Sequence, residues 1–353
     1  MPKGQTMTRV AILGGGIGAQ HLTAYGAVPG LDVALMVDQD VTRRAEVETL
    51  GIATSDSIEA ALADGIDLVD ICLPPHLHAP VALRALAAGK HVICEKPLAT
   101  SLHDVDRIVA AAQQAGRHVF PVFQYRFGPA FDQLAALRDA GLTGQPIAAA
   151  LETHWSRSAD YYSVPWRGTW EGEQGGAVLG HAIHAHDLMC HWMGPVRRLT
   201  ATLGTRANPI EVDDTAAISF ELDGGALATS SVTLGAATDE TRLRFVFEHL
   251  TATSHTLPYT PGEGHWTFAA RNPAQQQDVD AVLSAVTPGL AGCAGFLTEI
   301  RRSLDGEPNR AVTLDDVAAS IALVTAIYAS ARAGTPVDLP LPHDHPMRKG
   351  WRP

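Results

Sequence analysis

A short apolar run leads through four glycines into a helical pattern at Val10-Ala11-Ile12-Leu13-Gly14-Gly15-Gly16-Ile17-Gly18-Ala19-Gln20. The run fits the pattern G-x-G-x-x-G/A, in which a strand, a tight turn and a helix bind a dinucleotide. We expect Gly14 to allow the turn, Gly16 to let the backbone approach a pyrophosphate, and Ala19 to let the helix lie close to the strand. The phosphates would then lie at the N-terminus of the helix.

A second apolar run, residues 33–37, ends at Asp38. This is the spacing at which an acid holds the 2′-hydroxyl of the adenosine ribose, and its charge repels a 2′-phosphate. We therefore expect NAD as the cofactor. NADP is the alternative, because Arg43 and Arg44 follow on the next helix.

Length and charge restrict the class of protein. The 353 residues indicate two domains, and the net charge of −12 excludes nucleic acid as a partner. No apolar run of spanning length and no signal peptide is expected, so we expect no membrane. Met7 is a candidate start, with residues 1–6 as a leader. Four scattered cysteines suit a reducing cytoplasm.

Apolar strands alternate with helical patterns through the first third of the chain, which indicates a doubly wound parallel sheet. Ser101 is expected to cap one of these helices. Beyond Gly144 the pattern becomes rich in strands, with a hairpin turn at Asp223-Gly224-Gly225. We predict an α/β protein with a dinucleotide-binding domain at 1–127 and a substrate-binding and oligomerisation domain at 128–353, built on a large open, mostly antiparallel sheet.

The run Gly89-Lys90-His91-Val92-Ile93-Cys94-Glu95-Lys96-Pro97-Leu98 places a lysine at the end of a β-branched strand. Such a strand would deliver Lys96 to the carboxyl edge of the parallel sheet, where these folds bind ligands. Together with the glycine turn, this position suggests nicotinamide chemistry.

A second candidate site is a helix expected from about His181 to Gly194-Pro195, which is a helix stop. On it His184, Asp187 and His191 share one face, and the carboxylate can orient His184 as an acid or base. His186 and His191 are more readily explained as packing or capping residues. The alternative is a metal site drawn from His181, His184, His186, Cys190, His191 and His343-Asp344-His345, but no anchoring metal motif supports it, so we predict no metal.

An aromatic and basic segment, residues 153–170, precedes this helix. Aromatic rings stack on sugar rings, while arginines donate to hydroxyls or carboxylates, so the segment predicts a wall of a sugar or polyol pocket. A packing loop between domains is the alternative. Arg126, Arg157 and Arg167 would suit an anionic substrate or neutralise the cofactor pyrophosphate.

The chain resembles the Gfo/Idh/MocA family of nicotinamide oxidoreductases. The resemblance is carried by 14–19, Leu73-Pro74-Pro75 with His78, 87–92 into Glu95-Lys96-Pro97, 123–127, 166–170, and Gly175-Gly176 into His184 and Asp187. It implies a Rossmann domain, a second domain with a large open sheet, and a homodimer or homotetramer formed through that sheet. It further implies that Lys96 contacts the reacting hydroxyl, that His184 is the acid/base, and that Leu73, Pro74, His78 and Glu95 line the nicotinamide side. Many members carry an aspartate where this chain has Gly180, so altered or lost activity is conceivable.

The site residues predicted on these grounds fall into three sets. The catalytic residues are Lys96 and His184. The cofactor-binding residues are Gly14, Gly16, Ile17, Gly18, Asp38, Leu73, Pro74, His78, Glu95, Lys96 and Arg126. The substrate-binding residues are Lys96, Gln124, Trp155, Arg157, Tyr162, Trp166, Arg167, His181, His184 and Asp187.

The predicted function is reversible oxidation of a secondary hydroxyl on a sugar, polyol or sugar acid, with hydride transfer to the nicotinamide. Two alternatives remain at this point. One is a redox-neutral glycosidase or epimerase with a retained NAD, and the other is a dinucleotide-binding sensor without turnover.

Overall fold

The computed structural model describes residues 7–353, so the leader expected at residues 1–6 lies outside the described part. The chain divides into two compact units. The first comprises residues 1–122 and 293–318, and the second 123–292 and 319–353. The first division lies close to the predicted boundary at 127/128, while the segment 293–318 joins the N-terminal unit.

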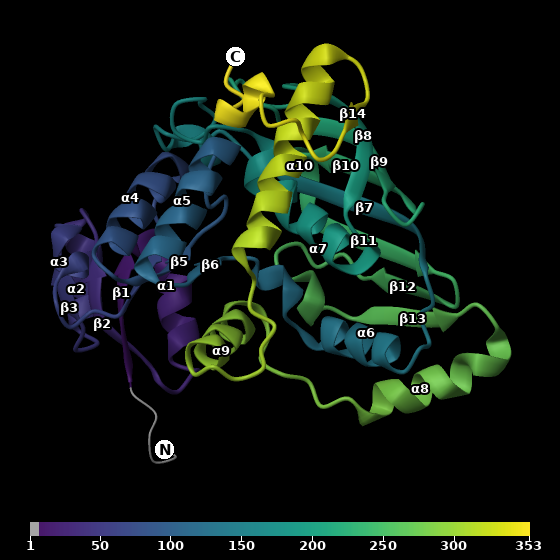
Figure 1. Cartoon of the computed structure of the whole chain (residues 1–353), viewed down its shortest axis with the longest axis horizontal. Coiled ribbons are helices and arrows are strands. Elements are labelled where there is room, and N and C mark those ends of the chain that lie inside the picture. Colours follow the sequence, from purple (N-terminus) through teal and green to yellow (C-terminus); the bar gives the residue numbers. More distant parts are fainter. Residues whose placement is uncertain (1–6) are drawn as a thin grey trace. The chain divides into compact units, whose positions relative to one another are not determined.

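Six parallel strands form the sheet of the first unit, in the order β3-β2-β1-β4-β5-β6 (Figure 1). They are β1 (Thr8–Leu13), β2 (Leu31–Val37), β3 (Ala53–Ser55), β4 (Leu68–Ile71), β5 (His91–Cys94) and β6 (Val119–Pro121). Because the strand order reverses between β3 and β4, the carboxyl ends of β1 and β4 lie side by side at a switch point. Sheets of this kind bind ligands there. The predicted doubly wound parallel sheet is confirmed.

Five helices connect these strands, and a sixth comes from much later in the chain. They are α1 (Gly15–Tyr25), α2 (Val41–Glu48), α3 (Glu59–Leu62), α4 (Pro75–Ala87), α5 (Leu102–Ala115) and α9 (Gly292–Leu304), the last of which belongs to this unit from residue 293 onward. The predicted cap of α5 is confirmed, because Ser101 Oγ accepts the N–H of Asp104 at 3.1 Å.

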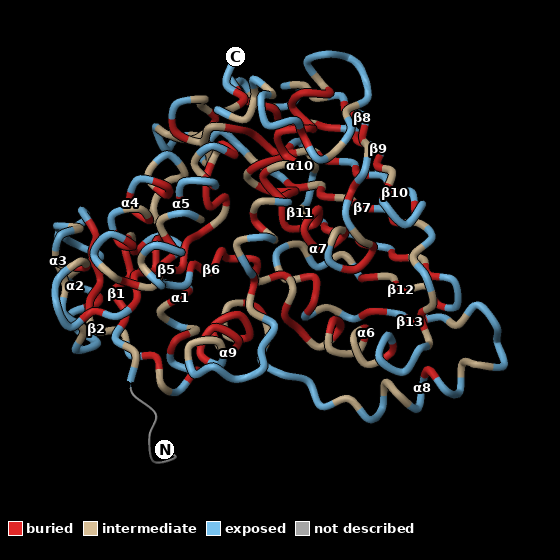
Figure 2. The backbone as a smooth tube through the Cα atoms, in the orientation of Figure 1, coloured by how far each residue is buried: buried red, intermediate tan, exposed pale blue. Residues whose placement is uncertain are grey.

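The central strands of the first sheet are buried on both faces, which explains their continuous apolar sequence. Residues 10–13 of β1 have no exposed surface, and Figure 2 shows this strand in the buried class. A sheet buried on both faces leaves its strand ends and the turns that follow them as the places where ligands can bind.

Eight strands form the sheet of the second unit, in the order β13-β12-β11-β7-β10-β9-β8-β14. They are β7 (Pro146–Ser156), β8 (Val196–Gly204), β9 (Thr215–Leu222), β10 (Leu227–Thr233), β11 (Gly235–Phe247), β12 (Leu250–Ser254), β13 (Trp266–Ala270) and β14 (Val337–Asp338). All neighbours are antiparallel except β7 and β10, so the predicted open, mostly antiparallel sheet is confirmed.

The predicted hairpin joins β9 and β10. The N–H of Leu222 donates to the carbonyl oxygen of Ala226, and Gly225 has φ +84°, a conformation that favours glycine. β11 begins at Gly235, and the first half of this strand gives no apolar signal in the sequence because its residues are mostly exposed and polar or small.

The helices of the second unit are α6 (Pro129–Asp139), α7 (Ile183–Met193), α8 (Gln276–Ala285) and α10 (Leu314–Ala333), the last of which starts in the first unit. A π-helical turn, η3 (Val178–Ala182), precedes α7, so the helix expected from His181 starts as a wider turn. The predicted stop is confirmed, since α7 ends at Gly194 with φ +100°.

Helix α10 is long and apolar enough to cross a membrane by length and composition. The expectation that no apolar run reaches this length is therefore wrong. Of the most apolar 18-residue stretch of α10, 61% is buried inside the structure, as in the core helix of a folded domain. Long core helices acquire the same composition because they are covered on most sides.

Candidate active site

The glycine turn after β1 leaves open space at one position and closes it at another. Gly14 has φ +94°, and a Cβ there would lie 2.5 Å from the carbonyl oxygen of Cys72. At the exposed Gly16, by contrast, a Cβ would have no neighbouring atom within 4 Å. Helix α1 starts here without a side-chain cap and without an acid in its first turn. The N–H of Gly15 donates to Asp38, and the amides that follow it at the start of α1 fit the pyrophosphate of a dinucleotide.

The close approach of α1 to β1 is made by Gly18. A Cβ at Gly18 would lie 2.8 Å from Cγ2 of Ile12. Ala19 is exposed, so the expectation that Ala19 lets the helix pack on the strand is wrong. The glycine pattern can be aligned in more than one register, and the structure places the small packing residue one position earlier. Ile17 is also exposed, at 38%.

Asp38 lies at the end of β2 and is nearly buried. Its Oδ2 accepts the N–H of Gly15 at 2.6 Å, and its Oδ1 accepts the N–H of Asp40 at 2.7 Å. Two cations lie beside it: Arg43 Nη1 is 3.5 Å from Oδ2, and Arg44 Nη1 donates to the Asp38 carbonyl at 2.7 Å. The acid is in place for a ribose, and the arginines could serve a 2′-phosphate if the acid were removed.

The turns that follow β4 and β5 are joined by His78. The ring nitrogens of His78 lie 2.7 Å from the carbonyl oxygen of Pro97 and 2.6 Å from that of Leu73. His78 is 1% exposed, so it positions the two turns, while Leu73, Pro74 and Lys96 are half-buried. The N–H of Lys96 donates to Oε2 of Glu95 at 3.1 Å.

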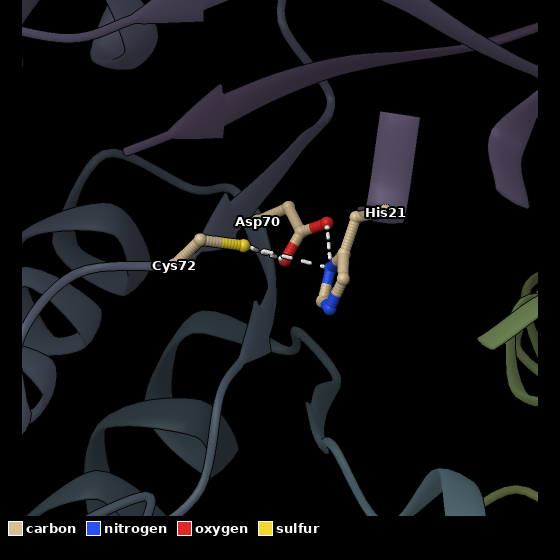
Figure 3. Close-up of side chains that lie close together, drawn as sticks. All are labelled: His21, Asp70 and Cys72. Atoms are coloured by element: carbon tan, nitrogen blue, oxygen red, sulfur yellow. Dashed lines mark hydrogen bonds and ion pairs between the residues drawn. The ribbon is translucent and has the colours of Figure 1, made fainter. Parts of the chain in front are cut away.

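A buried cluster that the sequence analysis did not identify lies behind these turns, and Figure 3 draws its members His21, Asp70 and Cys72. We call it the His21 cluster; it consists of His21, Asp70, Cys72 and Glu95. His21 Nδ1 lies 2.9 Å from Asp70 Oδ2, and His21 Nε2 lies 3.1 Å from Glu95 Oε1. One signal could have revealed it, because Asp70 interrupts an otherwise apolar strand.

The described residues 7–353 contain one group whose ligand atoms could surround a metal ion, namely His21, Asp70 and Cys72. None of these three residues belongs to the metal site considered as an alternative in the sequence analysis. Burial and the charge of Asp70 raise the pKa of the Cys72 thiol above its usual range, which disfavours the thiolate that metals bind.

In the second unit, His184 lies in an aromatic setting on α7. Its ring stacks on Tyr125 at 4.3 Å between centroids and meets the edge of Phe123 at 5.8 Å. The carboxylate of Asp187, one turn along, accepts two hydrogen bonds from Arg126, at 2.8 and 2.6 Å. Asp187 therefore holds Arg126 in a buried ion pair.

The neighbouring histidines differ in role. His181 packs edge-on against Trp155, with centroids 5.3 Å apart, and its Nε2 lies 3.3 Å from the hydroxyl of Tyr161. His186 bonds Ser230 at 2.9 Å, and burial lowers the pKa of His186 to about 4. The interpretation of His186 as a packing residue agrees with this setting.

The aromatic and basic segment holds its two arginines between rings and acids. The Arg157 guanidinium lies 5.0 Å from the rings of Trp155 and Tyr161, and it pairs with Asp239 at 3.2 Å. Arg167 lies 4.5 Å from the Trp166 ring and 3.8 Å from Glu173. Among the described residues, the buried polar atoms Gln124 Oε1, Arg157 Nε and the Tyr162 hydroxyl belong to predicted substrate residues and have no hydrogen-bond partner within the chain.

Gly180 lies in η3 and is half-buried. A Cβ at this position would have no neighbour within 4 Å. The position that departs from the family pattern is thus open rather than filled by another side chain.

The C-terminal tail folds onto the second unit and supports the start of η3. Trp351 is buried, stacks on Tyr328 at 5.4 Å, and donates its indole N–H to the Gln174 carbonyl. Tyr328 in turn donates to Asp213 at 2.5 Å, and Asp213 accepts the N–H of Val178 at 3.0 Å. Asp213 is thus a support of η3 that the sequence did not reveal.

An uncapped glycine turn, an acid at the end of β2 and a lysine at the end of β5 define a dinucleotide-binding protein of the Rossmann class. Two family models agree: residues 8–123 match the oxidoreductase family with an NAD-binding Rossmann fold, and residues 131–253 match the C-terminal domain of the same family. The chain belongs to the Gfo/Idh/MocA family of oxidoreductases.

Relatives in this family include an uncharacterized oxidoreductase of Synechocystis sp., 31% identical over 243 residues, which are 63% of this chain and 64% of that relative's length. D-apiose dehydrogenase of Paraburkholderia graminis is 28% identical over 348 residues, 90% of this chain and 86% of the relative. The crystal structure of the WlbA dehydrogenase from Bordetella pertussis in complex with NADH and UDP-GlcNAcA is similar, with a TM-score of 0.83, 27% identity, and coverage of 97% of this chain and 100% of that one.

Proposed function

We propose that the protein is an NAD-dependent dehydrogenase that reversibly oxidises a secondary hydroxyl of a sugar or polyol. The observation that carries this proposal is the edge of the first sheet, where the open Gly16 turn follows β1 at the switch point and the Lys96 turn follows β5, the strand next to β4. Family membership supports it, as do relatives named as sugar dehydrogenases.

Bound NAD supplies a hydride acceptor for the substrate carbon. Residues of this chain bind the cofactor, stabilise charge and accept the proton. The amides at the start of α1 bind the pyrophosphate, and Asp38 binds the adenosine ribose. The Lys96 ammonium stabilises negative charge on the reacting oxygen, and His184 accepts the hydroxyl proton.

We further propose that the substrate is uncharged where it meets the second unit. Arg126, Arg157 and Arg167 each have a carboxylate partner, so an anionic group would have to displace an existing ion pair. The aromatic rings and the unbonded polar atoms Gln124 Oε1 and Tyr162 hydroxyl suit a polyhydroxy ring instead.

We also propose a homodimer or homotetramer formed through the open face of the second sheet. Outward residues on β10 are exposed, including Leu227 at 59%, and small or polar residues such as Thr229 and Ser231 accompany it. Light scattering on the purified protein tests this, and a monomer at micromolar concentration would refute it.

The test of the activity is the absorbance of reduced nicotinamide with purified protein, NAD or NADP, and a panel of inositols, aldoses and sugar acids. We expect reduction of NAD with an uncharged polyol or sugar. Tightly retained NAD without net reduction would favour the redox-neutral alternative. Reversible NAD binding without any turnover would favour the sensor.

A further inference from the structure

We propose that His21 is a positioning residue whose doubly protonated ring bridges Asp70 and Glu95 and so holds a carboxylate under the nicotinamide end of the dinucleotide site. The inference rests on the proposed function. It concerns residues of the first unit alone.

The bridge geometry requires two N–H groups. Both ring nitrogens of His21 face carboxylate oxygens, at 2.9 Å for Asp70 and 3.1 Å for Glu95. A neutral imidazole has a single N–H, so one of these contacts would set a nitrogen lone pair against a carboxylate oxygen. An imidazolium satisfies both contacts at once.

The groups packed around His21 favour that charge. They are Tyr25 on α1, Asp70 and Cys72 at and after the end of β4, Glu95 after β5, and Cys293 on α9. Burial by itself lowers the pKa of His21, but the charge of the Asp70 carboxylate and its hydrogen bond to the ring outweigh burial and hold the pKa well above the ordinary value. Tyr25 donates its hydroxyl to Asp70 at 3.0 Å, which leaves that carboxylate well satisfied.

Glu95 connects this cluster to the site. One oxygen of Glu95 faces His21, and the other accepts the N–H of Lys96. The carbonyl of Cys72, another member of the cluster, abuts Gly14. The His21 cluster therefore lies directly behind the turns that follow β1, β4 and β5.

Strand order indicates which half of the dinucleotide lies above the cluster. Asp38 follows β2, on one side of β1, whereas Cys72 and Glu95 follow β4 and β5 on the other side. With the pyrophosphate at the turn after β1 and the adenosine ribose at Asp38, the nicotinamide half extends toward β4 and β5. With all three groups ionised, His21, Asp70 and Glu95 carry a net charge of −1, which favours the cationic ring of NAD⁺ over the neutral ring of NADH.

The test compares three ligands: NAD⁺, NADH and ADP-ribose, which lacks the nicotinamide. We expect His21→Gln to weaken NAD⁺ binding about tenfold, because the buried Glu95 carboxylate without its cationic partner takes up a proton and loses both its charge and its orientation. Binding of NADH should weaken less, and the affinity for ADP-ribose should stay within about twofold of the wild-type value. The matched control is Tyr25→Phe, which removes another hydrogen bond to Asp70 but leaves the bridge; it should change none of the three affinities. Should His21→Gln fail to fold, Glu95→Gln carries the same expectation.

Equal weakening of all three ligands would show a merely structural role and overturn the proposal, as would unchanged affinities. The charge is read separately from the ¹⁵N shifts of the His21 ring: two protonated nitrogens at neutral pH support the bridge, and one overturns it. Stabilisation by Zn²⁺ in the wild type but not in His21→Gln would also overturn it, because a metal would then replace the proton. A wild type that binds neither NAD⁺ nor ADP-ribose would refute the proposed function, while the ring measurement would still decide the charge of His21.

Discussion

Lys96 stands at the end of a buried strand, where its half-buried side chain can reach a ligand and its backbone is fixed by Glu95 and by the turn that His78 holds. We expect Lys96→Ala to lower turnover by about a hundredfold to ten-thousandfold, the range for losing a charge-stabilising or proton-transfer group. Affinity for NAD should stay nearly unchanged. Steady-state kinetics and a binding titration on the same preparation measure both, with Lys96→Arg as the charge-retaining control. Equal turnover in the alanine variant would remove Lys96 from the mechanism.

His184 on α7 packs against Tyr125 and Phe123, and the η3 turn that precedes α7 is anchored by Asp213. If it accepts the hydroxyl proton, His184→Asn should abolish the pH dependence of the chemical step. The pH profile of turnover at saturating substrate checks this. A profile that keeps its shape would point to His181 as the base.

We expect Asp38 to determine the preference for NAD over NADP. In Asp38→Ser the repulsion of a 2′-phosphate is removed while Arg43 and Arg44 remain beside the position. We therefore expect the ratio of NAD to NADP affinity to fall by about tenfold or more. Binding titrations with both cofactors measure it. Since Asp38 also accepts the N–H of Gly15, Asp38→Asn is the control that keeps the shape of the side chain.

At the scale of the elements, the turn between β1 and α1 contains one glycine that the fold requires and another that the bound cofactor requires. Gly14→Ala places a Cβ at φ +94° and 2.5 Å from the Cys72 carbonyl, so we expect loss of both stability and NAD binding. Gly16→Ala meets no atom of the chain, so stability should be retained while NAD binding weakens. Thermal unfolding and NAD titration of the two variants distinguish the roles. Unchanged NAD affinity in Gly16→Ala would mean that the pyrophosphate does not lie at this turn.

Helix α7 shows why local sequence patterns are an incomplete guide to an element. Its stop at Gly194 was readable because glycine at a helix end has a local cause. Its start was not, because the π-helical turn η3 depends on Asp213, which is distant in sequence and accepts the amides of Gly176 and Val178. The same holds for the tail, where Trp351 finds its partner Tyr328 only in the folded chain.

At the scale of the whole molecule, the buried charge of His21 links stability to pH. Its pKa is raised in the folded state, so the stabilisation it provides is fully present below the unfolded pKa of about 6.5 and is lost as the pH rises through the higher folded value. The groups facing it are Tyr25, Asp70, Cys72, Glu95 and Cys293. We expect the difference in unfolding free energy between wild type and His21→Gln to be larger at about pH 6 than at about pH 9. Urea unfolding at both values measures it, and a difference that grows with pH would contradict the charge assigned to His21.

The sequence by itself determined the class of fold, the cofactor turn and the strand that presents Lys96. These are local: alternation of apolar runs, glycines at fixed spacing, and an acid or a lysine placed at a strand end all act through neighbours in the chain. The strand-rich pattern beyond Gly144 likewise predicted the second sheet, which the structure confirms.

Only the tertiary structure decided which charges are paired and which small residue packs the helix. Gly18 rather than Ala19 approaches β1, and the partners of Arg126 and Arg157 lie 61 and 82 residues away in the sequence. The His21 cluster likewise joins a helix, two strand ends and a later helix. Ion pairs and buried hydrogen bonds depend on distances in space, and no spacing along the chain encodes these distances until the sheet has brought its strand ends together.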